Sequence, residues 1–231
     1  MAEILRTVVE DNVALLRFDD GKANTVSPAS LEALNRGLDR AEQEAGAALL
    51  IGRAGRFSAG FDLGTLREGG DVARNLVRGG AQLLLRMSEA PVPVIAACSG
   101  HALGMGALLL LASDLRIGAR GAFKIGLNEV GIGMVLPDFA VGFARERLSL
   151  RHRVRAAGLA EIYQAEGARD AGFLDLVVAP EVLLDTARDQ ARRLAMLPRK
   201  AFRETKRRLR GDMLRQIRSG LQDDMASWQI H

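Results

Sequence analysis

Short apolar runs, separated by polar or glycine-containing segments, recur along most of the chain. Two of them, Thr7–Val9 and Val13–Phe18, flank the polar residues Glu10-Asp11-Asn12. β-Branched runs on either side of a short polar turn predict a β-hairpin at the start of the chain. Further apolar runs predict strands at Ala47–Ile51, Pro91–Ala97, Asp114–Ile117, Ala122–Ile125 and Leu176–Val178.

Apolar residues at helical spacing appear between these strands. Ser27-Pro28 favours a helix start, and leucines follow three or four residues apart at 31, 34 and 38. Similar spacing predicts helices over Ala81–Met87, Gly106–Ser113, Phe139–Leu148 and Arg151–Ala157. Gly55–Gly60 predicts a loop, and Thr65–Gly80 has no clear pattern. Strands that alternate with helices predict an α/β fold with parallel pairing over residues 1–180, followed by a helical region over 181–231.

Composition and charge narrow the class of protein. The chain has 231 residues, 48% of them hydrophobic, which is enough for one well-packed domain. The single cysteine, Cys98, excludes an intramolecular disulfide and favours a reducing compartment. No signal peptide is evident, and the longest apolar run, Ala102–Ala112, is too short to span a bilayer. We therefore expect a soluble, cytoplasmic protein without a membrane partner.

Common catalytic and binding motifs are not found in the sequence. Gly104-Met105-Gly106 lacks the third glycine of a dinucleotide fingerprint, and there is no P-loop. Three histidines and one cysteine do not form a zinc-binding pattern, so we expect no metal. The formal charge is +4, with basic residues concentrated in Arg199–Arg210. Only Phe202 accompanies these arginines as an aromatic, which argues against nucleic-acid binding through stacked bases.

Two segments could stabilise negative charge on a substrate. In Phe57–Leu63, small residues follow a predicted strand, and in Gly100–Gly106 a glycine-rich turn precedes an apolar helix. Unpaired N–H groups at such bends and helix starts can hold an oxyanion. A single carboxylate, Glu129, follows in Asn128-Glu129-Val130-Gly131. Two such N–H donors ahead of one carboxylate predict an oxyanion hole.

At these residues the sequence resembles the crotonase superfamily of enoyl-CoA hydratases and isomerases. The resemblance is carried, in order, by Gly21–Asn24, Phe57–Leu63, Gly100–Gly106, Ser113–Ile117, Ile125–Gly133, Ala171–Asp175 and Glu204–Lys206. It implies a core built as a spiral of ββα turns, a C-terminal helical region that mediates assembly into a trimer or a dimer of trimers, and acyl-CoA substrates. CoA is then part of the substrate, and no separate cofactor is expected.

The resemblance also assigns site residues. The backbone N–H groups of Ala59 and Met105 would form the oxyanion hole. Residues that match the CoA-lining positions of the family are Lys22, Ala23, Ala59, Phe61, Asp62 and Leu63.

One departure from the family pattern bears on the reaction. Hydratases of this family use two glutamates; the first aligns with Leu108 and the second with Glu129. Leucine cannot transfer a proton, whereas one carboxylate is enough to move a double bond from Δ3 to Δ2. We therefore predict an enoyl-CoA isomerase in which Glu129 is the base, its pKa raised by apolar neighbours such as Leu108 and Phe61. A 2-enoyl-CoA hydratase and a non-catalytic acyl-CoA-binding protein remain the alternatives, and the acyl chain length stays open.

Overall fold

The largest sheet of the computed structural model, which describes residues 3–227, has six strands in the order β1-β2-β4-β7-β9-β11. Their bounds are β1 (Leu5–Glu10), β2 (Val13–Phe18), β4 (Ala47–Ile51), β7 (Val94–Cys98), β9 (Leu115–Ala119) and β11 (Leu176–Val178). β1 and β2 form the predicted antiparallel hairpin, with Val8 opposite Leu15. All other neighbours in this sheet are parallel, which confirms the α/β prediction.

Two smaller sheets lie beside the large one. β5 (Gly55–Ser58), β8 (Gly100–Leu103) and β10 (Ile125–Gly126) form a parallel sheet in the order β10-β8-β5. β3 (Thr25–Val26) pairs with β6 (Gly60–Phe61). The predictions of a loop over Gly55–Gly60 and of a turn from Gly100 were therefore wrong. These strands are short and rich in glycine, and partners more than 20 residues away along the chain hold them in the extended state.

Nine α-helices connect and cover the strands of the described part of the chain. They are α1 (Pro28–Glu44), α2 (Leu63–Arg67), α3 (Gly70–Glu89), α4 (Met105–Ala112), α5 (Asp138–Arg147), α6 (Leu150–Arg153), α7 (Ala165–Ala171), α8 (Leu183–Ala195) and α9 (Arg199–Ser227). Short helical turns are η1 (Val130–Ile132), η2 (Val154–Gly158) and η3 (Pro180–Val182). The predicted start of α1 is confirmed, because Ser27 and Ser30 form a capping box ahead of Pro28. The segment without a clear pattern, Thr65–Gly80, lies in α2 and α3.

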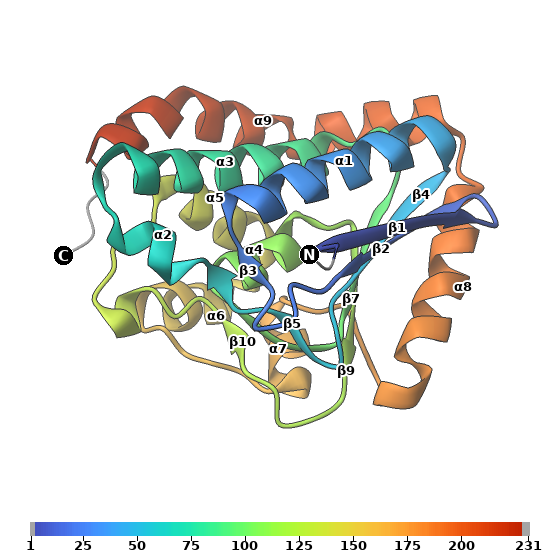
Figure 1. The fold of residues 1–231 in the computed structure, drawn as a ribbon, viewed down its shortest axis with the longest axis horizontal. Helices are drawn as coiled ribbons and strands as arrows, with labels where there is room; N and C mark the ends of the chain where they lie inside the picture. The colour runs from blue at the N-terminus through green and yellow to red at the C-terminus, as the bar shows by residue number, and fades with distance from the viewer. Residues whose placement is uncertain (1–2, 228–231) are drawn as a thin grey trace.

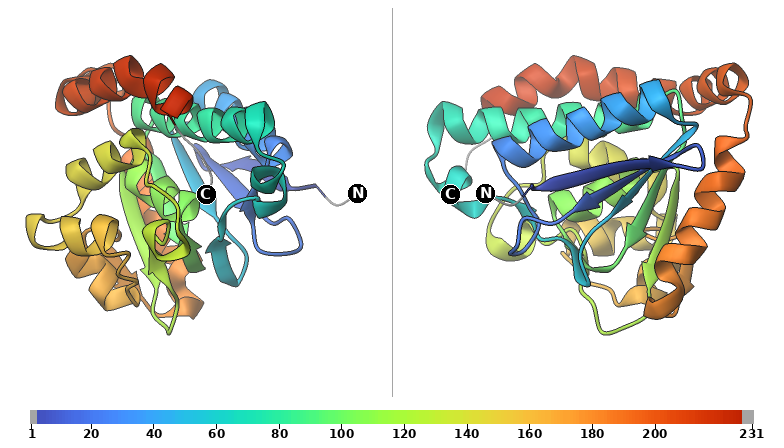
Figure 2. Two further views of the ribbon diagram at one scale, coloured as in Figure 1. Left: turned by 90° about the vertical axis from the view of Figure 1, so that its left-hand side faces the viewer. Right: turned by 45° about the vertical axis from the view of Figure 1, so that its right-hand side comes forward.

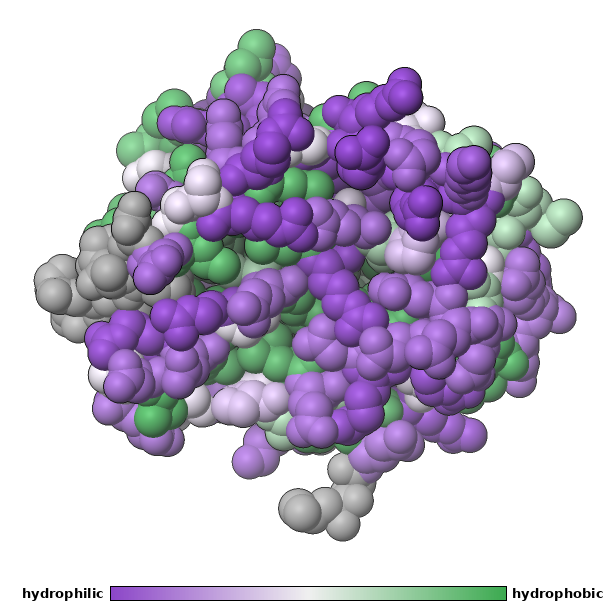
Figure 3. Space-filling view, turned by 90° about the horizontal axis from the view of Figure 1, so that it is seen from above, coloured by the Kyte–Doolittle hydropathy of each residue, from purple (hydrophilic) through white to green (hydrophobic). Residues whose placement is uncertain are grey.

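The helices form layers on both faces of the large sheet. α8 packs on one face, where Leu183, Ala187 and Ala191 join a core with residues of β2, β4, β7 and β9. α1, α3 and α4 pack on the opposite face in the larger core. α9 crosses above α3 and contacts α5 (Figures 1 and 2). The face of this helical layer is mainly hydrophilic, with hydrophobic residues visible between the polar rows (Figure 3).

The C-terminal helical region consists of α8 and α9 in the described residues, and residues 228–231 lie outside them. α9 packs against α3 and α5 of its own chain (Figure 1), so part of it contributes to the core through Met213, Leu214 and Ile217. Its role in assembly into a trimer stays a prediction. None of the described helices combines the length and apolar character of a membrane span.

Candidate active site

The first loop of the site runs from β5 into β6 and α2. Gly60 has a φ of +96°, a left-handed conformation that favours glycine. A Cβ atom built on Gly60 would lie 2.9 Å from the carbonyl oxygen of Leu103 and 3.4 Å from the backbone nitrogen of Met105. Asp62 then ends the loop, because its side chain accepts a hydrogen bond from the N–H of Thr65 (2.8 Å) and caps α2. Gly60 therefore lets the first loop approach the start of α4.

The second loop runs from β8 into α4. Gly104, with a φ of +52°, donates its N–H to the carbonyl oxygen of Gly126 on β10 (3.0 Å). The first bond of α4 joins the N–H of Leu108 to the carbonyl oxygen of Gly104 (3.0 Å). The N–H of Met105, at the first helical position, therefore has no acceptor within the helix. A Cβ atom on Gly106 would lie 2.9 Å from Cβ of Ser58, so α4 packs directly on β5.

The N–H groups of the first loop differ in what they can bind. The N–H of Ala59 donates to the carbonyl oxygen of Ala23 (3.0 Å), so the donor that the sequence assigned to the oxyanion hole is already engaged. The N–H of Asp62 donates to the carbonyl oxygen of Val26 on β3 (3.0 Å). Because successive N–H groups along a strand point to opposite sides, the N–H of Phe61 points away from β3. Phe61 is therefore the better placed donor in this loop.

Glu129 lies between β10 and η1. A Cβ atom built on Gly104 would lie 3.2 Å from Oε1 of Glu129, so the carboxyl group is next to the start of α4. Oε2 is buried, and no described residue donates a hydrogen bond to it. Burial raises the pKa of Glu129 to about 7, and a hydrogen bond from its own backbone lowers it only partly. A carboxyl group with a pKa near neutrality can both accept and return a proton.

Leu108 lies one turn into α4 from Met105. Its side chain is 2% exposed and belongs to the main hydrophobic core, together with Met105, Leu127 and Phe139. No acid takes the place on α4 that the first glutamate of the hydratases would occupy. The carboxyl group of Glu129 is thus the buried acid next to the start of α4, whereas that of Asp62 caps α2.

The residues predicted to contact CoA come together at one edge of the molecule. Ala23 and Ala59 are joined by the hydrogen bond described above, and pairing of β3 with β6 brings Phe61, Asp62 and Leu63 beside them. Lys22 is exposed, and Leu63 is 52% exposed.

Asn24, which the sequence did not single out for a role, anchors this edge. It is fully buried, its Nδ2 donates to the carbonyl oxygen of Phe18 (2.8 Å), and its carbonyl oxygen accepts from Oγ of Ser58 (2.7 Å).

Two basic side chains of α9, Lys206 and Arg210, are engaged within the fold. Nζ of Lys206 donates to Oδ2 of Asp114 (2.6 Å) and to the carbonyl oxygen of Met87 (3.0 Å). Arg210 pairs with Oδ1 of Asp114 (3.1 Å) and donates to the carbonyl oxygen of Ala112 (2.9 Å). Both side chains are almost fully buried. Lys206 and Arg210 therefore fix α9 to the core.

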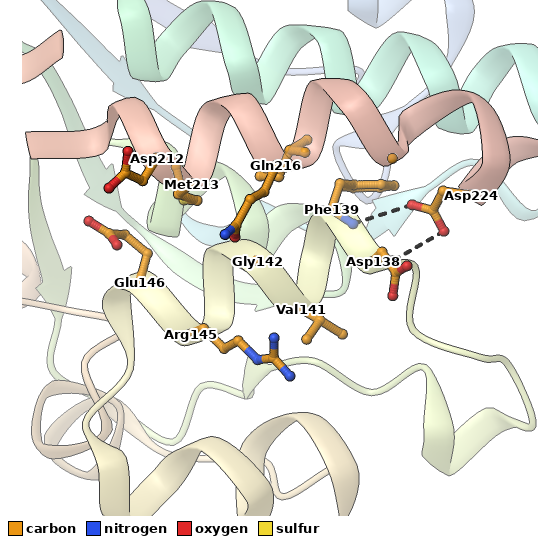
Figure 4. Close-up of a pocket in the computed structure, with 12 residues that line it drawn as sticks. Asp138, Phe139, Val141, Gly142, Arg145, Glu146, Asp212, Met213, Gln216 and Asp224 are labelled. Atoms are coloured by element: carbon orange, nitrogen blue, oxygen red, sulfur yellow. Dashed lines mark hydrogen bonds between the residues drawn. The ribbon is translucent and has the colours of Figure 1, made fainter. Parts of the chain in front are cut away.

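A groove of about 460 Å³ lies between α5 and α9 (Figure 4), and its lining includes no residue of the two loops. At its end, the carboxylate of Asp224 accepts hydrogen bonds from the N–H groups of Asp138 (3.1 Å) and Phe139 (3.3 Å). Asp224 therefore caps the start of α5, where Pro137 offers no side-chain cap. Burial and the charge of Asp138 raise the pKa of Asp224. The contact joins the far end of α9 to the segment that follows Glu129.

Comparison with known proteins identifies the family. The family model described as enoyl-CoA hydratase/isomerase matches residues 9–228. The chain is 40% identical over 136 residues to a probable enoyl-CoA hydratase of Bacillus subtilis, and 36% identical over 160 residues to the 1,2-epoxyphenylacetyl-CoA isomerase of Escherichia coli. The aligned segments cover 57% and 65% of this chain, and 52% and 59% of those two relatives. The match thus spans little more than half of their length.

Solved structures are similar over nearly the whole chain. An enoyl-CoA hydratase/isomerase family protein of Pseudomonas syringae is 38% identical, with 98% of each chain covered and a TM-score of 0.96. An enoyl-CoA isomerase of Mycobacterium tuberculosis is also 38% identical, with 99% and 100% covered and a TM-score of 0.94. The human mitochondrial Δ3-Δ2-enoyl-CoA isomerase, at 23% identity, shares the fold (97% and 91% covered, TM-score 0.91). The chain has the α/β crotonase fold and belongs to the enoyl-CoA hydratase/isomerase family.

Proposed function

We propose that the protein isomerises 3-enoyl-CoA thioesters to 2-enoyl-CoA thioesters, with Glu129 as the only carboxylate that moves the proton. The observation that carries the proposal is the position of Glu129: its carboxyl group is buried, lies beside Gly104 at the start of α4, and has a pKa of about 7. A base with this pKa is half ionised at neutral pH, which suits proton transfer in both directions.

The reaction needs one proton to move between two carbons of the same substrate. The carboxylate of Glu129 removes a proton from C2, and the electron pair of that C–H bond moves into the thioester to form a dienolate. We assign the negative oxygen to the N–H groups of Phe61 and Met105, with Phe61 in place of Ala59. The protonated Glu129 then returns the proton to C4, and the double bond forms between C2 and C3. No water is added, so no second carboxylate is required at Leu108.

Oxyanion donors of this kind supply a large part of the rate. Removing one donor in other enzymes lowers the rate by about 10² to 10³. In this chain the donors are backbone groups, held by Gly60 and Gly104 in left-handed conformations. The Ala59 N–H lies in the same loop but serves the fold, because its bond to Ala23 joins the loop to the segment before β3.

The test offers 3-enoyl-CoA and 2-enoyl-CoA to the purified protein and follows both products. We expect conversion of the 3-enoyl substrate, little water addition to the 2-enoyl substrate, and loss of isomerisation in Glu129→Gln with unchanged CoA binding. Rapid formation of 3-hydroxyacyl-CoA would instead identify a hydratase. Tight binding of both substrates without any product would identify an acyl-CoA-binding protein without catalysis.

A further inference from the structure

Gly80 lies in the interior of α3 and is buried. Glycine destabilises a helix interior relative to alanine, so its lack of a side chain at this position calls for a structural reason. A Cβ atom built on Gly80 would lie 2.6 Å from Cε1 of the Phe61 ring and 3.3 Å from Cε of Met105. The bare backbone of α3 therefore leaves the space into which these two side chains pack.

Phe61 and Met105 are the two residues whose N–H groups we assign to the oxyanion hole. They come from different loops, and Gly80 is in contact distance of both side chains. Phe61 lies on β6, a strand of only two residues that follows the left-handed Gly60. Pairing of β6 with β3 fixes the side to which the Phe61 N–H points, and the packing of the ring against α3 is a second constraint on the position of this residue. Met105 is 1% exposed and begins α4. The residues of both donors therefore pack at the same place on α3.

We propose that Gly80 is a positioning residue of the oxyanion hole. Because it has no side chain, those of Phe61 and Met105 can pack against α3, and this packing sets the spacing of the two N–H donors. The inference rests on the proposed function, because it takes these two N–H groups as the donors. A methyl group at residue 80 would push the Phe61 ring away from α3, since carbon atoms of different side chains pack at about 3.5 to 4.0 Å from each other. Because β6 has only two residues, part of this displacement would reach the backbone of Phe61 and move its N–H.

The neighbouring residue Gly79 provides a matched control. It lies in the same helix, but a Cβ atom built on it would meet only Cδ1 of Leu31 on α1, at 2.8 Å. That atom is the end of a flexible side chain outside both loops. Gly79→Ala and Gly80→Ala make the same chemical change one residue apart, and only the second affects the proposed donors.

The experiment measures exchange of the C2 protons of a saturated acyl-CoA in D2O, which needs the base and the oxyanion hole but no double bond. Calorimetry with CoA and thermal unfolding are measured on the same samples. Since a misplacement of about 1 Å can cost about 100-fold in rate, we expect Gly80→Ala to lower the exchange rate by at least about tenfold. The affinity for CoA should change by less than about twofold, and Gly79→Ala should exchange at the wild-type rate.

A second variant changes Phe61, the other residue of the contact with Gly80. Phe61→Leu removes the ring, so we expect a smaller loss of exchange, and Phe61→Leu combined with Gly80→Ala should exchange at the rate of Phe61→Leu alone. Wild-type exchange in Gly80→Ala, or equal losses in Gly79→Ala and Gly80→Ala, would overturn the proposal. If Gly80→Ala does not fold, wild-type exchange in Phe61→Leu overturns it. If the wild-type protein does not exchange the saturated substrate, the same comparison is made on the isomerisation of 3-enoyl-CoA; no isomerisation would refute the proposed function itself, and this inference with it.

Discussion

Glu129 should make the stability of the protein depend on pH in a way that exposed glutamates do not. Its pKa is raised from 4.5 to about 7 because its carboxyl group is buried, and Oε2 has no hydrogen-bond donor among the described residues. At about 1.4 kcal/mol per pKa unit, this shift corresponds to about 3 kcal/mol of unfolding free energy. In the unfolded chain Glu129 ionises near pH 4.5, whereas in the folded protein its carboxyl group keeps the proton until about pH 7.

The sign follows from which state binds the proton. Between pH 4.5 and 7 the folded state binds more protons than the unfolded state, so this group lowers stability as the pH rises through that window. Above pH 7 the ionised carboxylate lowers the unfolding free energy by the full amount of about 3 kcal/mol, and below pH 4.5 it does not lower it. Glu129→Gln removes the charge and keeps the shape. We therefore expect it to gain about 3 kcal/mol relative to wild type between pH 4 and pH 8.

Urea unfolding of both proteins at half-unit steps from pH 4 to pH 8.5 measures this difference. Glu181→Gln, which changes an exposed glutamate, is the control and should show no trend between the same limits. A difference between wild type and Glu129→Gln that stays constant across the range would refute the burial argument. A difference that grows with falling pH would mean that the pKa of Glu129 is lowered, and that a donor satisfies it in the folded protein.

Three further predictions concern activity, anchoring and assembly. The isomerisation rate should rise with pH through an apparent pKa of about 7, because the ionised form of Glu129 is the base; a rate that is flat from pH 5 to 8 would contradict this. Lys206→Met should lower the unfolding free energy by about 3 kcal/mol, because it removes the buried ammonium group that pairs with the half-buried Asp114, whereas the exposed Lys200→Met should leave urea unfolding unchanged. Light scattering should give a mass near three times 24.9 kDa, since exposed apolar residues such as Ile132, Val135 and Val154 would be covered in a trimer; a monomer mass would refute that prediction.

Sequence patterns predicted those elements whose signals are local. The hairpin of β1 and β2 has a polar turn between two apolar runs, and α1 has Ser27 and Pro28 at its start. The short strands β5 and β8 were not predicted, because they contain glycine and too few residues to alternate, and the strand predicted over Ala122–Ile125 overlaps β10 only at Ile125. Their extended state depends on partners far along the chain. The first half of α3 was not predicted, because Gly79 and Gly80 interrupt the helical pattern there. Tertiary packing stabilises this part of the helix instead.

The candidate site was predictable in its residues and less so in its atoms. The sequence identified Glu129 and both loops, because charge and glycine content are local properties of the chain. It assigned the first donor to Ala59, but the direction of an N–H group depends on strand register. The N–H of Ala59 bonds to Ala23, and pairing of β3 with β6 leaves the N–H of Phe61 pointing away from β3. The burial of Lys206 and Arg210 was also invisible, since Asp114 lies more than 90 residues away.

The most direct test of the account follows the proton that Glu129 is proposed to carry. A 3-enoyl-CoA labelled with deuterium at C2 is converted in ordinary water, and the position of the label in the 2-enoyl product is read by NMR at early times. Transfer by one buried carboxylate predicts deuterium at C4 in a measurable share of the product, and no product from Glu129→Gln. Product whose C4 hydrogen comes entirely from water, or wild-type turnover by Glu129→Gln, would contradict the single-carboxylate mechanism.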